Sequence, residues 1–122
     1  MYEYLARVRK VIDGDTVDLT VDMGFHVTML QRVRLRGVDA PEIRGPCREA
    51  GAAAKAFVQA ALPEGTKVFI RTYKLGKYGR YIADLKWIPE EPEPTLQRLL
   101  EEGRDLAEAL IEAGHGVAYP EV

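Results

Sequence analysis

The chain has 122 residues, of which 47% are hydrophobic and 30% are charged. These values are typical of one ordinary globular domain, so we expect residues 1–122 to form a single domain and exclude a disordered chain. No apolar run approaches membrane-spanning length, and the first residues do not resemble a signal peptide, so we expect no membrane association. The compartment stays unknown, either cytoplasmic or exported after processing, because the single cysteine, Cys47, only rules out an internal disulfide.

The formal net charge of −2 conceals an uneven distribution along the chain. Residues 1–87 contain 15 Lys and Arg against 10 Asp and Glu, whereas residues 88–122 contain 2 against 9. A positive face on the first part suits a polyanionic partner such as nucleic acid. We expect the acidic part to lie away from such a partner.

The first third of the chain predicts three strands. Residues 2–12 are rich in β-branched and aromatic side chains, which is typical of a strand. An Asp-Gly turn at residues 13–16 follows, and then apolar and polar residues alternate over residues 17–22 and again over residues 27–36. Three successive strands joined by short turns form a meander.

A helix and two further strands are predicted next. After a loop over residues 41–48, apolar residues recur at helical spacing from Gly51, and Pro63 ends the helix. The apolar stripe of this helix comprises Ala54, Phe57, Val58, Ala61 and Leu62. Residues 66–72 and 80–87 predict the fourth and fifth strands, joined by a polar loop over 73–79.

The acidic C-terminal part predicts a connector and two helices. Residues 89–94 alternate Pro and Glu, which indicates a stiff extended connector on the surface. A short helix is predicted over residues 95–101, with Thr95 as its N-cap. Asp105 is placed to cap a final helix, and Glu108 would complete a capping box. The stripe expected to pack that helix on the rest of the domain comprises Leu106, Ala109, Leu110 and Ala113.

Five short strands, a helix between the third and fourth, and a C-terminal helix describe one architecture. We predict a mainly β (α+β) fold, the five-stranded OB-fold barrel, whose face and loops often bind nucleic acid.

Residues 34–42, Arg-Leu-Arg-Gly-Val-Asp-Ala-Pro-Glu, join a strand end to a rigid turn. The stretch delivers the guanidinium of Arg34 and the carboxylates of Asp39 and Glu42 to one place. That combination suits a phosphodiester, a hard cation and an activated water. The alternative is a charged strand that leaves the barrel through an Asp-Pro turn with no functional role.

Three segments together resemble the signature blocks of the staphylococcal nuclease (thermonuclease) family. They are residues 11–17 (VIDGDTV), residues 34–42 and residues 77–80 (KYGR), in the family's order and with compatible spacing. Residues 106–114 also resemble that family's second core helix. The resemblance implies an OB-fold enzyme, a calcium-dependent nuclease that hydrolyses DNA and RNA and leaves 3′-phosphates, and we expect it to act as a monomer.

The resemblance also implies a metal site and a general base. Asp15 and Asp39 would bind Ca²⁺ through their carboxylates, with the backbone carbonyl of Ala40 as a further ligand. Asp13 would lie beyond these direct ligands, near the metal. Glu42 would position or deprotonate the attacking water. Ala40 stands where the best-known member has threonine, which matters little if only the carbonyl binds.

The substrate contacts follow from the same resemblance. Arg34 and Arg80 would grip the scissile phosphate, and Lys77 and Tyr78 would contact nucleotide phosphates. Tyr119 either stacks on a base or packs against the barrel. Taken alone, Arg80 is more typical of a solvated loop charge, and the Asp-Gly-Asp segment is more typical of a turn.

Two other classes of function stay open at this point. One is an OB-fold module that binds nucleic acid without catalysis, and the other is a structural domain stabilised by calcium. Silent modules usually lose catalytic carboxylates or arginines, whereas this chain retains Asp15, Arg34, Asp39, Glu42 and Arg80.

Overall fold

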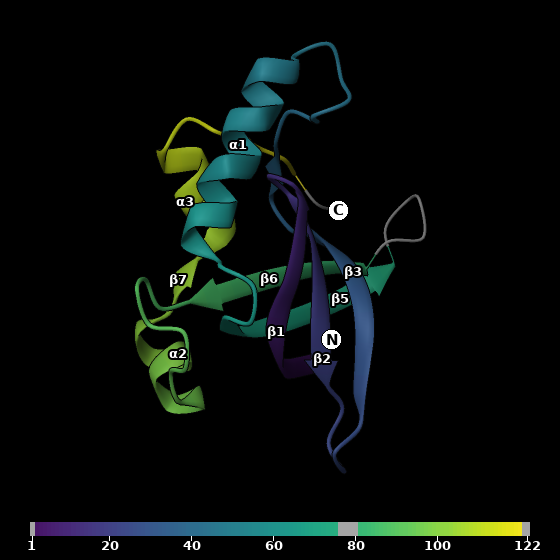
Figure 1. The fold of residues 1–122 in the computed structure, drawn as a ribbon, viewed down its shortest axis with the longest axis vertical. Helices are drawn as coiled ribbons and strands as arrows, with labels where there is room; N and C mark the ends of the chain where they lie inside the picture. The colour runs from purple at the N-terminus through teal and green to yellow at the C-terminus, as the bar shows by residue number, and fades with distance from the viewer. Residues whose placement is uncertain (1, 76–80, 121–122) are drawn as a thin grey trace.

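The predicted meander forms the first half of the sheet (Figure 1). In the computed structural model, which describes residues 2–75 and 81–120, β1 (Tyr2–Asp13), β2 (Thr16–Asp22) and β3 (Thr28–Leu35) pair as antiparallel neighbours. These bounds differ from the predicted ones by a residue at most ends, because alternation marks the buried middle of a strand more clearly than its end.

Two later strands close the sheet into a barrel. β5 (Lys67–Leu75) pairs antiparallel with β1, and β6 (Tyr81–Trp87) pairs antiparallel with β5. β6 also pairs with β3 in parallel over three residues, with Val33 opposite Tyr81. The result is a closed five-stranded barrel with a helix between its third and fourth strands, which confirms the OB-fold prediction.

The barrel interior collects the inward-facing residues of all five strands. On β2 every second residue is buried, but on β3 burial is confined to the second half, where Val33 and Leu35 have no exposed surface. The predicted alternation therefore corresponds to the observed core on β2 and at the end of β3, whereas Val27 and Met29 are exposed. β5 runs on to Leu75, so the prediction of a loop from residue 73 is wrong at its start. The register shift in the β5–β6 ladder at this point explains why alternation did not reveal the extension.

Two of the three helices lie on the same side of the barrel in Figure 1. α1 (Arg48–Ala61) begins three residues before the predicted start and packs on β1 through the predicted stripe. α3 (Leu106–Glu112) buries Leu106, Ala109 and Leu110. Ala113 is exposed, so its place in the apolar stripe was wrong. The helix ends at Glu112 and the chain turns away through Gly114, whose φ is 79°.

The predicted caps have different outcomes. Thr95 caps α2 (Leu96–Glu102), because its hydroxyl accepts a hydrogen bond from the Arg98 amide at 3.2 Å. Asp105 occupies the N-cap position of α3 but makes no side-chain cap hydrogen bond, so the capping box is wrong. One carboxylate oxygen of Asp105 is buried without a partner among the described residues. Asp105 also belongs to β7 (Arg104–Asp105), which pairs with β6, and this pairing sets the side chain's direction.

Burial, together with the Glu108 and Asp84 carboxylates, raises the pKa of Asp105 above its ordinary value of 3.8. The folded protein therefore holds this proton more tightly than the unfolded chain, and stability is lost as pH rises from about 3.8. We expect Asp105→Asn to be more stable than the parent at pH 7, by less than about 1 kcal/mol because the side chain is partly exposed. Urea unfolding at pH 7 and pH 3 measures this. The two proteins should converge at pH 3, and a less stable variant at pH 7 would contradict the assignment.

Two-residue strands complete the fold. β4 (Val38–Asp39) pairs antiparallel with β8 (Val117–Ala118), which brings the C-terminal segment alongside the turn that follows β3. Pairs this short carry no periodicity, so they were not predicted. No helix in residues 2–75 and 81–120 is long and apolar enough to cross a membrane.

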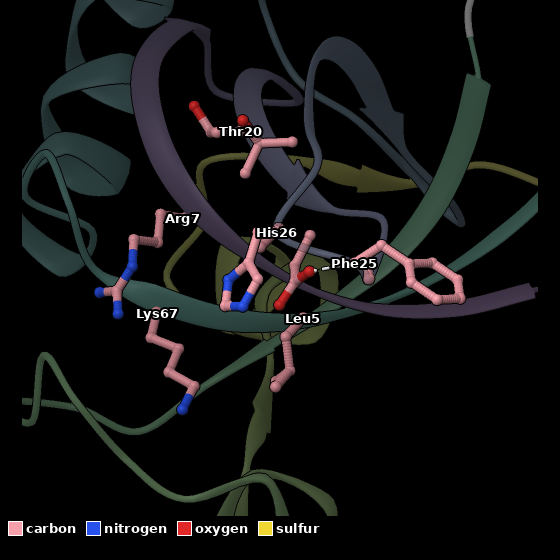
Figure 2. A pocket seen from close by; sticks show the side chains of 10 residues that line it. Leu5, Arg7, Thr20, Phe25, His26 and Lys67 are labelled. Atoms are coloured by element: carbon pink, nitrogen blue, oxygen red, sulfur yellow. Dashed lines mark hydrogen bonds between the residues drawn. The ribbon is translucent and has the colours of Figure 1, made fainter.

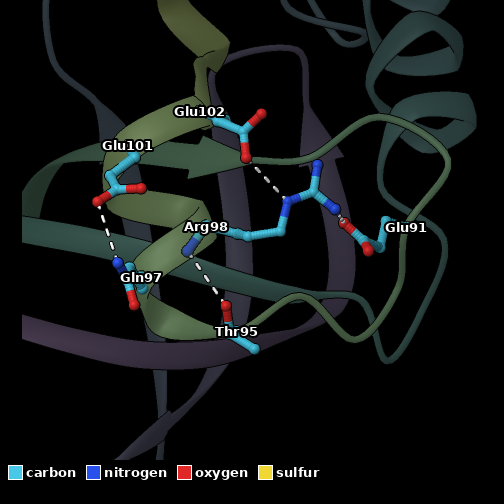
Figure 3. A network of polar contacts seen from close by, with 6 residues as sticks. All are labelled: Glu91, Thr95, Gln97, Arg98, Glu101 and Glu102. Carbon is cyan, nitrogen blue, oxygen red and sulfur yellow. Dashed lines mark hydrogen bonds and ion pairs between the residues drawn. The ribbon is translucent and has the colours of Figure 1, made fainter.

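The acidic connector lies on the surface and is held by ion pairs. Glu93 binds Arg7 of β1, and Glu91 binds Arg98 of α2. Figure 3 shows the Arg98 guanidinium between Glu91 and Glu102, with its Nε 3.1 Å from Glu102 Oε2. The prediction of an extended connector is wrong at its start. The Glu91 amide donates to the Ile88 carbonyl at 3.2 Å, which closes a turn over Pro89 and Glu90, and Glu90 has a φ of 64°.

Candidate functional site

Asp15 lies in the turn between β1 and β2, against the end of β3. Its side chain is only 6% exposed. One carboxylate oxygen accepts a hydrogen bond from the Thr16 hydroxyl at 3.1 Å, and the other accepts one from the Ala40 amide at 3.1 Å. The Asp15 carbonyl accepts a further bond from Leu35 N at 2.8 Å. Two segments that are 25 residues apart thus meet at one carboxylate.

Arg34 is placed beside this carboxylate by the sheet register. Thr16 and Arg34 are opposite each other in the β2–β3 ladder. The Arg34 side chain is only 15% exposed, and its Nη2 donates to the Val38 carbonyl at 3.1 Å and lies 3.9 Å from Asp39 Oδ1. These contacts orient the guanidinium on the chain that carries Asp39.

Tyr119 packs on Arg34 rather than on the barrel interior. The guanidinium carbon lies 4.7 Å from the centre of the Tyr119 ring. The Tyr119 amide donates to the Gly37 carbonyl at 3.0 Å, next to the β4–β8 pair. A cation stacked on an aromatic face is held in orientation at little entropic cost. The structure therefore connects Tyr119 to the candidate site through Arg34.

The loop after β4 is anchored at two points. Asp13 Oδ1 accepts a hydrogen bond from the Ile43 amide at 3.1 Å. Gly51 of α1 lies directly against the loop, since a Cβ there would be 2.5 Å from the Glu42 carbonyl oxygen and 2.8 Å from Ile43 N. Only glycine allows this approach. Glu42 itself is exposed, so its backbone is held by α1 while its carboxylate faces solvent.

The donor set at this point fits calcium. Asp15, Asp39 and the Ala40 carbonyl offer only oxygen atoms, which are the ligands that calcium takes in proteins. Each Asp15 oxygen accepts one hydrogen bond, which leaves lone pairs for a cation. Within residues 2–75 and 81–120, no three His, Cys, Asp or Glu side chains are grouped closely enough for a metal cluster. Asp15, Asp39 and the Ala40 carbonyl are the candidate ligands, and a calcium ion held by them would need water oxygens to complete its shell.

The remaining predicted site residues lie outside the part of the chain that the structure describes. Arg80, Lys77 and Tyr78 fall in the segment 76–80, which is not among the described residues. Their roles stay predictions.

One arrangement was missed at the sequence level. The Arg36 guanidinium lies over the Tyr73 ring at 4.5 Å from its centre, and the Tyr73 hydroxyl donates to Asp84 at 2.7 Å. The hydrogen bond to Asp84 and partial burial raise the pKa of Tyr73 above its ordinary value of 10.0. Arg36 continues the alternation of arginines that includes Arg34, and this alternation is the sequence feature that could have identified Arg36 as a candidate.

Comparison with known proteins gives one family. The family model described as staphylococcal nuclease homologue matches residues 32–122, which is 91 of the 122 residues. No curated protein matches the chain. The match begins after Asp13 and Asp15, so their connection to the matched part rests on the hydrogen bonds to Ile43 and Ala40. The closed barrel and the matched segment agree, and the chain belongs to the family of staphylococcal nuclease homologues.

Proposed function

We propose that this protein is a calcium-dependent nuclease that hydrolyses DNA and RNA. The observation that carries the proposal is the hydrogen bond from the Ala40 amide to Asp15, because it joins the Asp15 carboxylate to the backbone next to Asp39, whose carboxylate lies 3.9 Å from Arg34. A largely buried guanidinium next to a carboxylate suits a phosphodiester, because Asp15 and Asp39 would hold a cation and Arg34 would bind the phosphate oxygens.

The proposed reaction is an in-line displacement at phosphorus. Water adds to the phosphorus, the bond to the 5′ oxygen breaks, and that oxygen takes a proton from solvent, so the products are a 3′-phosphate and a 5′-hydroxyl. Glu42 takes the proton of the attacking water, because its exposed carboxylate is free to face solvent while Asp15 and Asp39 hold the ion. Bound calcium supplies positive charge to the phosphate oxygens and to the water.

Arg34 opposes the charge that grows on the phosphate oxygens as water attacks. A guanidinium gives two parallel hydrogen bonds where an ammonium gives a point charge. Arg80 is proposed as the second clamp, and Lys77 and Tyr78 as contacts to neighbouring phosphates, on the resemblance alone. Asp13 holds the loop that carries Glu42 through the Ile43 amide.

A digestion assay tests the proposal. Single-stranded DNA is incubated with the protein in calcium, in magnesium and in a calcium chelator. We expect cleavage in calcium, weak cleavage in magnesium and none in chelator, because an open site of oxygen ligands suits the larger ion. Asp15→Asn, purified in parallel, controls for a contaminating nuclease and should be inactive. Binding of the DNA without cleavage in any metal would instead identify a non-catalytic module.

Replacing Gly51 tests how α1 positions Glu42. Gly51→Ala improves helix propensity by about 1 kcal/mol but places a methyl group against the backbone of Glu42 and Ile43. The loop must move, and a displacement near 1 Å costs about 10²-fold in rate. We expect kcat to fall by about that factor while calcium affinity changes little. Ala53→Ser, at an exposed α1 position, is the control and should retain full activity.

The acidic connector should have no effect on catalysis. Glu91 and Glu93 are already paired with Arg98 and Arg7, and exposed charges more than about 8 Å away are largely screened at physiological salt. Replacing Glu90, Glu91 and Glu93 with Gln is therefore expected to keep the rate of single-stranded DNA cleavage within about twofold of the parental rate. If the connector instead folds over the site as a repelling lid, the triple variant would cleave several-fold faster, and the gain would shrink as salt is raised.

A further inference from the structure

The open end of the barrel forms a cup that the catalytic proposal does not use. Its cavity measures about 490 Å³. The floor consists of the buried side chains of Val21, Val33 and Ile70. The walls comprise Tyr2, Tyr4, Met23, Met29, Gln31, Thr72, Tyr73 and Tyr81. Volumes of 300–1,000 Å³ and mouths of β-barrels are typical of small-ligand sites.

The rim of this cup is unusually apolar for a surface. Tyr2 is 69% exposed, Met29 51%, and Met23 and Tyr81 are each 40% exposed. Contiguous exposed apolar side chains of this kind mark a binding surface. Four tyrosines and two methionines offer aromatic faces and polarisable sulfur atoms, both of which pack well on a flat ring. Gln31 and Thr72 add a few polar atoms at the wall.

We infer that the cup binds one base of the nucleic acid strand whose phosphate lies at Arg34. The inference rests on the proposed function and deepens it, since it makes an unstacked, single-stranded segment the preferred substrate. Base stacking on aromatic side chains is tolerant of sequence because every base has a flat face. A base lying in the cup would be unpaired, so a duplex would have to open locally before it is cut.

The cup is connected to the candidate site through Arg36, which follows Arg34 by two residues just after β3. Val33 in the floor of the cup points to the opposite face of β3 from Arg34 and does not make this connection. Arg36 stacks on Tyr73, and Tyr73 lines the cup. Arg34 and Arg36 therefore provide successive cations between the candidate metal ligands and the rim. A strand that follows these arginines brings a base to the mouth of the barrel.

The chain provides a matched control on the same hairpin. Phe25 is 99% exposed in the turn between β2 and β3, yet it does not line the cup. Phe25 instead lines a separate pocket together with Arg7, His26 and Lys67, and Figure 2 shows its ring pointing away from these three side chains. Removing the Phe25 ring reduces exposed aromatic surface without changing the proposed base site.

Calorimetric titration with unlabelled hexathymidylate in EDTA measures binding without cleavage. We expect Tyr81→Ala and Met29→Ala each to weaken binding, with Tyr81→Ala costing roughly 5- to 150-fold. Tyr81→Phe and Phe25→Ala should bind like the parent. A series of hexamers with one abasic position then locates the base. At one position, removing the base should strongly weaken binding of the hexamer by the parent protein. The same removal should hardly change binding by Tyr81→Ala, because the two changes remove the same contact.

The outcomes separate this inference from the proposed function. Normal calcium-dependent cleavage with no loss of affinity in Tyr81→Ala or Met29→Ala would overturn the base site and leave the nuclease intact. The base site would also be overturned if no abasic position weakened binding by the parent more than binding by Tyr81→Ala. Sedimentation that shows a dimer in the parent and a monomer in Tyr81→Ala would identify the cup as a contact between copies and would also overturn it. Absence of cleavage together with intact, coupled oligonucleotide binding would retain the base site and reject the nuclease.

Discussion

Replacing Arg34 with lysine is expected to lower kcat for single-stranded DNA by about 10²–10³-fold, with an affinity change of only a few-fold. Lysine keeps the positive charge but loses the planar pair of donors that opposes charge growing in the transition state. It also loses the bond from Nη2 to the Val38 carbonyl and the stacking on Tyr119 that orient the group. Single-turnover cleavage and separate binding titrations distinguish the two effects.

Arg32 provides the control for this substitution. It lies two residues earlier on the same face of β3, is exposed, and pairs with Asp18 at 2.7 Å. Arg32→Lys should therefore leave kcat unchanged. If Arg34→Lys weakened binding and left turnover intact, Arg34 would position the substrate without stabilising the transition state. An equal loss in both variants would indicate a general effect of charge or folding.

Glu42→Gln is the second substitution that we expect to lower turnover strongly. The amide cannot take a proton from the attacking water, and loss of a general base typically costs 10²–10⁴-fold in rate. Calcium affinity should be unchanged, because in the proposed arrangement Glu42 does not bind the ion. Turnover at saturating substrate and a calcium titration by calorimetry measure the two quantities on the same preparation.

Glu49 is the matched control for Glu42. It is an exposed glutamate in the first turn of α1, close in sequence and outside the proposed site. Glu49→Gln should cleave at the parental rate. A Glu42→Gln variant that remained fully active would exclude Glu42 as the base, and one that lost calcium affinity would make it a ligand instead.

Much of the barrel and one half of the site follow from local sequence. Alternating apolar residues identify the buried face of β2 and of the second half of β3, and helical spacing identifies the stripe of α1, because each pattern depends only on the period of its own element. Residues 34–42 place Arg34, Asp39 and Glu42 within nine residues of one another, so their proximity needs no tertiary information. The resemblance to the staphylococcal nuclease family was confirmed.

Only the tertiary structure decides which segments meet. Alternation says which face of a strand is buried but not which strand lies beside it, and so the parallel pairing of β3 with β6 that closes the barrel was not predicted. The tertiary structure also decides that the Asp15 carboxylate meets the Ala40 amide, that Tyr119 stacks on Arg34 and that Gly51 lies against Glu42. The cup at the barrel mouth likewise takes its walls from β1, β2, β3, β5 and β6. Contacts between residues far apart in the chain depend on how the whole sheet curls, and no local period encodes that curvature.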